Sequence, residues 1–246
     1  MPLRSDGFIY RYYCLGSGSG RQYFSNTNGK KIDTIRLKIR EWREEEKIDS
    51  ALYYYLLASL LESADKVANI ASVYGAFLKH MKKSALKDMV LESADFMKNH
   101  NRHQVFNRDS NELIKEIKGD ILYLDPPYNH RQYGANYHIL NTISLYEVFF
   151  PKGKTGLPNY NHSPYSKKTK VPNAFEELIK NANFKYIFLS YNNEGWMSKN
   201  DIKNIMSKYG KYTLAQKEHK RFKANKTDVR NHKLNKTFEY LHILEK

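Results

Sequence analysis

Four consecutive residues, Asp125-Pro126-Pro127-Tyr128, have the chemistry expected of a site that handles the exocyclic amine of a nucleobase. That amine is a poor nucleophile because its lone pair is delocalised into the ring. Hydrogen bonds to a carboxylate and a backbone carbonyl would draw it toward tetrahedral geometry and stabilise the positive charge that grows on nitrogen as it attacks a methyl group. A tyrosine ring could stack on a base that has left the duplex. The alternative is a plain strand-to-loop turn, since Asp-Pro and Pro-Pro are common turn formers.

The sequence before this motif supports the functional interpretation. The apolar stretch "ILYL" at 121–124 predicts a strand that runs directly into the two prolines. In an open α/β sheet, ligands bind just outside the carboxyl ends of the strands. The prolines also restrict the backbone of Asp125 and Pro126 to non-helical conformations, which predicts a stiff, exposed elbow.

The elements around the motif predict an α/β fold. A strand at 103–107 and a helix at 110–117, ended by Gly119, precede it, and helices at 136–150 and 174–182 follow. A strand at 185–192, a helix at 198–210 and two β-rich segments at 211–224 and 236–246 complete the chain. We therefore expect an α/β sheet that ends in an antiparallel hairpin.

The first hundred residues have a different character. Residues 1–28 read as loops with short extended pieces. An amphipathic helix is predicted at 29–42, a second helix begins near Asp49 and Ser50, and a third with a basic face covers 74–89. This region is therefore expected to be mainly helical.

The charge balance favours a polyanionic partner. Lys and Arg number 41 against 26 Asp and Glu, a formal net charge of +15, and the chain also holds 20 Tyr and 12 Phe. Such a surplus steers nucleic acid to the surface, and aromatic rings can stack on bases. Solvated lysines and core aromatics are the alternative at each position. The candidate DNA-binding residues are Lys79, Lys83, Lys167, Lys168, Arg221 and Lys223.

Other classes of protein are disfavoured. Cys14 is the only cysteine, so neither an intrachain disulfide nor a cysteine-based zinc cluster can form, and we expect no metal. No apolar run is long enough to cross a bilayer, and the first residues do not resemble a signal peptide. The sequence predicts a cytoplasmic protein.

With its companion segments, the motif resembles a known family. "ILYLDPPYN", "YFSNTNGKKIDTIRLKIREW", "SADKVANIASVYGAFLK", "YNHRQYGANYHILNTI" and "YIFLSYNNEG" together resemble Dam-like DNA adenine N6-methyltransferases of restriction–modification systems. The resemblance implies S-adenosylmethionine as cofactor, double-stranded DNA as substrate and a companion restriction endonuclease. It also implies a mainly helical target-recognition region at 1–102 and a catalytic α/β portion at 103–246, built on a partial Rossmann-like methyltransferase sheet with a terminal antiparallel hairpin. The similar protein-glutamine methyltransferases carry asparagine at the first motif position, so Asp125 favours a nucleobase amine.

The resemblance also implies roles for individual residues. Asp125 and the Pro126 carbonyl would bind the target amine, with Asp125 also near the methionine end of the cofactor, and Tyr128 would stack on the flipped adenine. Asp109 and Ser110 occupy the place where the family contacts the adenosine of the cofactor. A cap on the following helix is the equally weighted, and compatible, alternative. Asn192 and Asn193 would line the same pocket or form a polar turn.

The run "CLGSGSGR" at 14–21 tests whether the family's glycine-rich cofactor loop is present. Such a loop should follow a buried strand and precede a helix. The sequence predicts no buried strand before the run, in "GFIYRYYC", and no helix after it, in "RQYFSNTNG". We therefore interpret the run as a turn in the recognition region. The chain then resembles a family member that lacks the amino-terminal S-adenosylmethionine-binding motif. Either a separate amino-terminal methyltransferase segment would complete it, as in a split enzyme, or it is a non-catalytic DNA-binding fragment.

Overall fold

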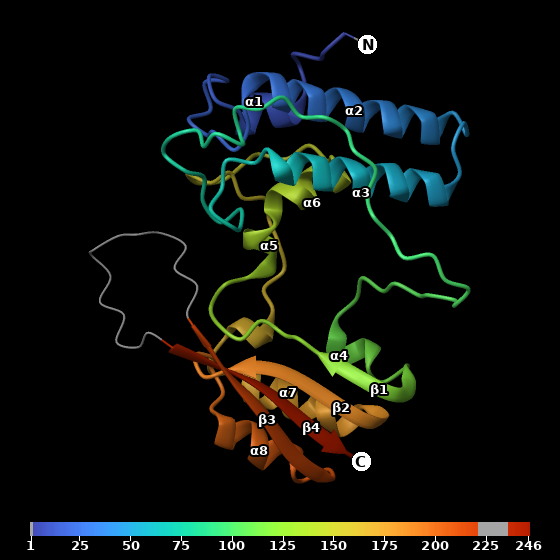
Figure 1. The fold of residues 1–246 in the computed structure, drawn as a ribbon, viewed down its shortest axis with the longest axis vertical. Helices are drawn as coiled ribbons and strands as arrows, with labels where there is room; N and C mark the ends of the chain where they lie inside the picture. Colours follow the sequence, from blue (N-terminus) through green and yellow to red (C-terminus); the bar gives the residue numbers. More distant parts are fainter. Residues whose placement is uncertain (1, 221–235) are drawn as a thin grey trace. The chain divides into compact units, whose positions relative to one another are not determined.

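A computed structural model describes residues 2–220 and 236–246 (Figure 1). These residues form two compact units, each built from two segments of the chain. Unit 1 comprises residues 1–100 and 133–161, and unit 2 comprises residues 101–132 and 162–246. The segment 133–161, which follows the Asp-Pro-Pro-Tyr motif in sequence, therefore packs with the first hundred residues.

Unit 1 is helical. Its core is formed by apolar side chains of α1 (Phe8–Tyr13), α2 (Asn26–Glu44), α3 (Ser50–Lys66) and α6 (His138–Leu145), and the short α5 (Tyr133–Asn136) precedes α6. The two long helices confirm the predictions at 29–42 and after Asp49. Asp49 caps α3 by accepting a hydrogen bond from the Leu52 amide at 2.8 Å, as its position in the sequence predicted.

The prediction of loops and extended pieces throughout residues 1–28 is wrong, because α1 lies within them. This helix has no capping side chain of its own. The carboxylate of Asp33, on α2, instead accepts hydrogen bonds from the amides of Ile9 at 2.9 Å and Tyr10 at 2.8 Å. Asp33 also accepts a hydrogen bond from the hydroxyl of Tyr146. The helix is thus stabilised by a residue far away in sequence, which local propensity does not reveal.

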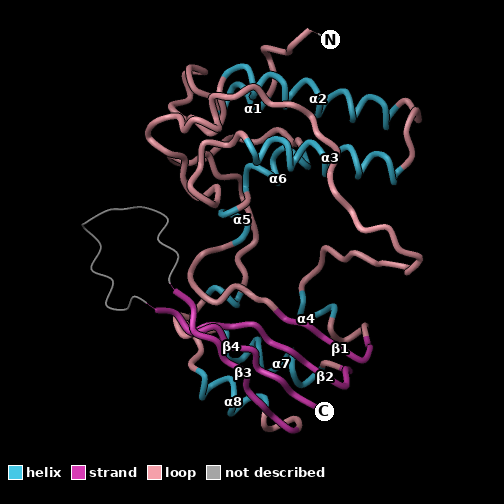
Figure 2. The backbone as a smooth tube through the Cα atoms, in the orientation of Figure 1, coloured by secondary structure: helices cyan, strands magenta, loops and turns pink. Residues whose placement is uncertain are grey.

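Two further predictions fail in the stretch between α3 and α4, which Figure 2 shows as loop throughout. The third helix at 74–89 and the strand at 103–107 are both absent from it. The backbone carbonyl of Asn69 accepts a hydrogen bond from the Leu78 amide, and its side-chain oxygen accepts one from the Lys82 amide, each at 3.0 Å. These two bonds explain part of the result. The half-buried ammonium of Lys82 donates to the Ile70 carbonyl. These contacts use backbone groups that a helix would need internally.

The predicted helix at 136–150 is shorter than expected. It ends at Leu145, and Tyr146 adopts a left-handed conformation with φ 51°. The buried guanidinium of Arg36 donates to the carbonyls of Ile143 at 2.9 Å and Ser144 at 2.8 Å. A cation from another helix thus satisfies carbonyls at the carboxyl end of α6, where they have no partner within the helix.

Unit 2 is a four-stranded sheet with helices. Its strands occur in the order β1-β2-β4-β3, and β1 pairs with β2 in parallel while β4 runs antiparallel to both β2 and β3. This mixed sheet with a terminal β3–β4 hairpin confirms the predicted α/β fold class. The elements are α4 (Ser110–Leu113), β1 (Lys118–Leu124), η1 (Pro164–Ser166), α7 (Val171–Asn181), β2 (Asn183–Asn192), α8 (Lys199–Met206), β3 (Lys211–Lys220) and β4 (Lys236–Glu245). Gly119 lies inside β1 and does not end the preceding helix.

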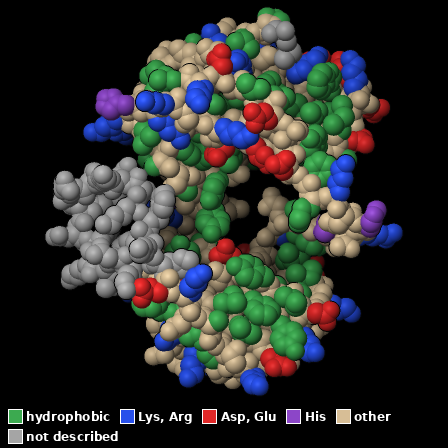
Figure 3. All heavy atoms as spheres, viewed as in Figure 1, with side chains coloured by type: hydrophobic (Ala, Val, Ile, Leu, Met, Phe, Trp, Pro, Cys, Tyr) green, Lys and Arg blue, Asp and Glu red, His purple; other side chains and the backbone are tan. Residues whose placement is uncertain are grey.

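The core of unit 2 lies on one face of the sheet. Ile187, Leu189 and Leu244 are fully buried there, in a cluster with side chains of α7 and α8, and Figure 1 shows both helices on the same side of the strands. Side chains on the other face alternate with these. Among them, Ile121 and Tyr123 of β1 are 63% and 61% exposed, and Figure 3 shows hydrophobic side chains gathered over the strands.

Candidate active site and DNA-contacting residues

The Asp-Pro-Pro-Tyr motif begins directly after Leu124, the last residue of β1. Because β1 and β2 are parallel, with Leu124 opposite Leu189, the motif and the end of β2 lie at the same edge of the sheet. The Asp125 carboxyl is solvent-exposed, whereas Pro126, Pro127 and Tyr128 are half-buried. The elbow expected from the sequence is therefore present, and it displays an acidic group at the sheet edge where ligands of α/β folds bind.

Tyr128 is held in place by residues at the end of β2 and in the turn that follows it. Its carbonyl accepts a hydrogen bond from the amide of Trp196 at 2.9 Å, and its ring meets the ring of Tyr191 edge-on at a centroid distance of 5.9 Å. Burial raises the pKa of Tyr128, the charge of Glu239 raises it further, and a hydrogen bond with the Asn192 side chain acts in the opposite direction. The tyrosine is thus a fixed aromatic surface.

Gly195 makes this arrangement possible, and the sequence analysis did not single it out. A Cβ at this position would lie 2.2 Å from Cε1 of Tyr191, so the turn can pass the ring only if residue 195 has no side chain. The sequence signal was a glycine between a strand end and an aromatic residue, in "YNNEGW". Tyr191, Gly195 and Trp196 therefore position the stacking residue of the candidate site.

Asn192 and Asn193 form the polar turn that was one of their two predicted alternatives. The side-chain oxygen of Asn192 accepts a hydrogen bond from the Glu194 amide at 3.0 Å, and that of Asn193 accepts one from the Phe238 amide at 3.0 Å. The second contact joins the turn to β4. Asn192 is only 5% exposed, and its bond to Tyr128 links it to the motif.

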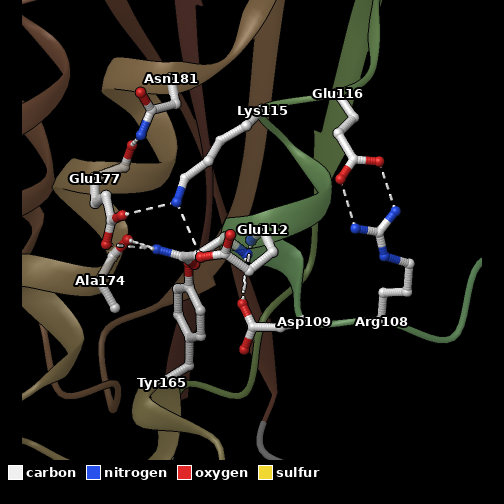
Figure 4. A network of polar contacts seen from close by, with 10 residues as sticks. Arg108, Asp109, Glu112, Lys115, Glu116, Tyr165, Ala174, Glu177 and Asn181 are labelled. Atoms are coloured by element: carbon white, nitrogen blue, oxygen red, sulfur yellow. Dashed lines mark hydrogen bonds and ion pairs between the residues drawn. The ribbon is translucent and has the colours of Figure 1, made fainter.

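Asp109 acts as a helix cap, as one interpretation predicted. Its carboxylate accepts hydrogen bonds from the amides of Asn111 at 2.8 Å and Glu112 at 3.3 Å, and Figure 4 shows it directed at the start of α4. Ser110 lies near Tyr165, whose hydroxyl donates to Asn111 at 2.7 Å. Figure 4 also shows the ion pair of Arg108 with Glu116 and the contacts of Lys115 with Glu112 and Glu177. A contact of Asp109 and Ser110 with a cofactor stays a prediction.

The candidate DNA-binding lysines fall in both units. Lys79 and Lys83 are exposed on the unit 1 loop that replaces the predicted third helix. Lys167 and Lys168 are exposed directly after η1 in unit 2. Arg221 and Lys223 lie outside the described residues. Residues 151–172, which hold five lysines and no acidic residue, are divided between the units at residue 161, with Lys152 and Lys154 in unit 1.

The glycine-rich run lies between α1 and α2 in unit 1. Gly16, Gly18 and Gly20 all adopt left-handed conformations, with φ 77°, 84° and 71°, so the run is a series of turns. A helix, not a strand, precedes it, as expected for a segment other than a cofactor loop. A helix also follows it, from Asn26, where the sequence analysis expected none. The prediction for the residues after the run is therefore wrong, because Ser25 caps α2.

An acidic elbow with a fixed tyrosine, at the carboxyl end of a parallel strand, is the type of site that the sequence analysis connected with methylation of nucleobase amines. The family model for D12 class N6 adenine-specific DNA methyltransferases matches residues 8–205. The chain belongs to this family, which confirms the resemblance and the predicted adenine-specific DNA methyltransferase function. Family membership implies a methyl donor, S-adenosylmethionine.

Several curated proteins are similar to the chain. The Type II methyltransferase M.NlaIII of Neisseria lactamica is 63% identical over 246 residues, which are 100% of this chain and 73% of that protein. M.CviAII of Paramecium bursaria Chlorella virus 1 is 44% identical over 92% of this chain and 67% of its own length. M.FokI of Planomicrobium okeanokoites is 40% identical over 90% of this chain, but the chain spans only 35% of that protein. No solved structure matches the chain. In the part of the chain that the structure describes, none of the helices could cross a membrane.

Proposed function

We propose that this chain provides the target-amine half of a DNA adenine N6-methyltransferase site. The observation that carries the proposal is the Asp-Pro-Pro-Tyr elbow at the end of β1, with Tyr128 fixed by the turn after β2. The Asp125 carboxylate and the Pro126 carbonyl would accept hydrogen bonds from N6 of a flipped adenine. Both would stabilise the positive charge that develops there during the reaction. Tyr128 would stack on the base.

The charge of Asp125 suits one end of the cofactor. The methionine end of S-adenosylmethionine carries a cationic ammonium and a sulfonium, and an exposed carboxylate such as that of Asp125 can attract both. When bound, S-adenosylmethionine supplies the methyl group. Asp109 and Ser110 are the candidates for its adenosine end, a role compatible with the cap because a carboxylate has further acceptor positions.

Replacement of Asp125 tests the proposal. In an active assembly, Asp125→Ala should lower the incorporation of labelled methyl groups into duplex DNA by roughly 100-fold or more, the order found when a group that stabilises developing charge is removed. Asp120→Ala is the matched control, because Asp120 is an exposed aspartate within β1, just before the motif. Methyl transfer at the wild-type rate by Asp125→Ala would contradict the assignment.

The proposal has three further parts, which concern the cofactor loop, the biological role and the division of the chain. First, polypeptide outside these 246 residues would provide the glycine-rich cofactor loop, since the run at 14–21 is a series of turns between helices. Second, the chain would serve as the modification component beside a companion restriction endonuclease. Third, residues 1–102 would recognise the target and 103–246 would carry the catalytic portion. Because the substrate is DNA, we expect the protein in the cytoplasm.

Calorimetric titration tests the first part. The chain alone should bind S-adenosylmethionine weakly or not at all, and a supplied segment with an aromatic-x-Gly-x-Gly loop should restore binding. Micromolar affinity of the 246-residue chain by itself would contradict this part of the proposal and leave the role of Asp125 untouched.

A further inference from the structure

Residues 147–157 of unit 1, which we call the finger loop, are ordered by several side chains, and the Arg21 guanidinium makes the largest number of these contacts. Arg21 donates to the carbonyls of Gly153 at 2.9 Å and Lys154 at 3.2 Å, and more distantly to that of Pro151 at 3.4 Å. It also donates to the Tyr12 carbonyl, just before the glycine-rich turns. One side chain thus orders three peptide groups of the finger loop.

Other side chains of unit 1 hold the rest of the finger loop. The Tyr13 hydroxyl donates to the Gly156 carbonyl at 2.6 Å, and Nε2 of His138 lies 3.0 Å from the Thr155 carbonyl. The loop closes on itself through reciprocal backbone hydrogen bonds between Lys152 and Leu157, at 2.9 and 2.8 Å. Its conformational entropy is therefore lost on folding and need not be lost again when a partner binds.

This ordered loop presents apolar side chains to solvent. Val148 is 90% exposed and Phe150 is 81% exposed, while Phe149 between them packs against Phe8 at a ring distance of 5.0 Å. The alternation shows that the backbone directs residues 148 and 150 outward. An ordered loop with two apolar side chains directed into solvent offers a preformed apolar contact surface to a partner.

The charges beside Phe150 indicate what that partner is. Lys152 and Lys154 are both exposed, and the ammonium of Lys152 bonds to the neutral side chain of Asn159 at 2.8 Å. Residues 148–172 include no Asp or Glu, and the nearest acidic residue in sequence is Glu147. Two lysines next to an outward aromatic ring match DNA, which offers phosphates and base faces together.

We infer that the finger loop is a DNA-contacting element, in which Lys152 and Lys154 bind phosphates and Phe150 packs against an unstacked base step. The inference rests on the proposed function in one respect, namely that duplex DNA is the substrate. It adds a contact in unit 1 that is independent of the Asp-Pro-Pro-Tyr motif and of the lysines singled out from the sequence.

Binding of a fluorescent duplex by the 246-residue chain tests the inference. Phe150→Ala should weaken binding roughly ten-fold, in the range seen when aromatic groups that stack on bases are removed. Met97→Ala is the matched control, because Met97 is a 90% exposed apolar residue of the same unit. A combined Lys152→Ala and Lys154→Ala variant should lower the slope of log affinity against log salt by about 1.8, or about 0.9 for each phosphate that is no longer neutralised.

The outcomes separate the two proposals. If wild-type protein binds duplex and the Phe150 and lysine variants bind equally well, the finger loop does not touch DNA, but the proposed function stands. If wild-type protein fails to bind duplex at all, the inference on the finger loop falls, and methyl transfer by Asp125→Ala in an active assembly decides the proposed function separately. Thermal unfolding of each variant at the wild-type midpoint would show that weaker binding does not reflect unfolding, which is expected because the replaced side chains are exposed.

Discussion

The two units bury their residues in different ways. Unit 1 encloses charged groups, since Asp33 and Arg36 are 0% and 2% exposed and each bonds to backbone groups of another helix. Unit 2 buries one face of its sheet and leaves Ile121 and Tyr123 exposed on the other. Unit 1 therefore depends on polar contacts between distant segments, whereas unit 2 depends on apolar packing and keeps its candidate catalytic groups at an open edge.

Replacement of Asp33 should produce the largest effect and break unit 1 selectively. Asp33→Ala leaves the buried Ile9 amide, the half-buried Tyr10 amide and the Tyr146 hydroxyl without this acceptor, so we expect a loss of roughly 3–5 kcal/mol. Trp42 lies in unit 1 and Trp196 in unit 2, so fluorescence in a Trp196→Phe background reports on unit 1 during urea unfolding. Asp88→Ala is the control, because that aspartate pairs with Lys31 on the surface. Equal losses for both variants would contradict the role of Asp33.

A pair of isoleucines sharpens the description of unit 2. Ile187→Ala removes a fully buried side chain and should cost about 3 kcal/mol, whereas Ile121→Ala, on the exposed face, should cost less than about 0.5 kcal/mol. Trp196 fluorescence in a Trp42→Phe background measures both. A cost above roughly 2 kcal/mol for Ile121→Ala would show that this face is covered in solution.

Gly195 connects packing to the candidate site. Gly195→Ala forces a methyl group against the Tyr191 ring and should cost about 2 kcal/mol. Because the clash is with that ring, the cost should largely disappear when the same change is made in a Tyr191→Ala background. Methyl transfer should fall in Gly195→Ala through displacement of Tyr128. Additive costs in the double variant would rule out the clash as their cause.

His242 provides the smallest effect, a dependence of unit 2 on pH. Burial lowers its pKa to about 4, and the charge of Lys199 contributes. The unfolded chain binds a proton near the ordinary value of about 6.5, whereas the folded protein resists protonation. Above about pH 6.5, His242 is neutral in both states and the free energy of unfolding does not depend on its protonation. As the pH falls toward about 4, protonation of the unfolded chain lowers the free energy of unfolding by about 1–2 kcal/mol. His242→Gln, which does not titrate, should unfold with a weaker pH dependence over that interval. An unchanged slope would contradict the assignment.

The sequence predicted those elements whose signals are local. The two long helices of unit 1 were found from apolar periodicity and the Asp49 cap, and β1 was found from its apolar run before two prolines. Prediction failed where distant residues decide the structure. Asp33 forms the amino-terminal cap of α1, and Asn69 accepts hydrogen bonds from two amides of the basic segment at 74–89.

The candidate site shows the same limit. The Asp125–Tyr128 elbow was visible because proline chemistry and a strand end coincide in sequence. Its supports were not, since Tyr191, Gly195 and Trp196 meet Tyr128 only through the pairing of β1 with β2. Arg21 was likewise visible as part of a glycine-rich run, but its bonds to the finger loop join residues more than a hundred positions apart.

Cys14 has a practical consequence for work on this protein. The thiol is fully buried in unit 1, and burial raises its pKa far above the ordinary value, so alkylating reagents will find almost no reactive thiolate in the folded state. Because Cys14 is the only cysteine in the chain, the folded protein presents no thiol that maleimides can label. A cysteine introduced at an exposed position can carry a fluorophore without background labelling. The labelling rate of Cys14 itself then reports how often unit 1 opens.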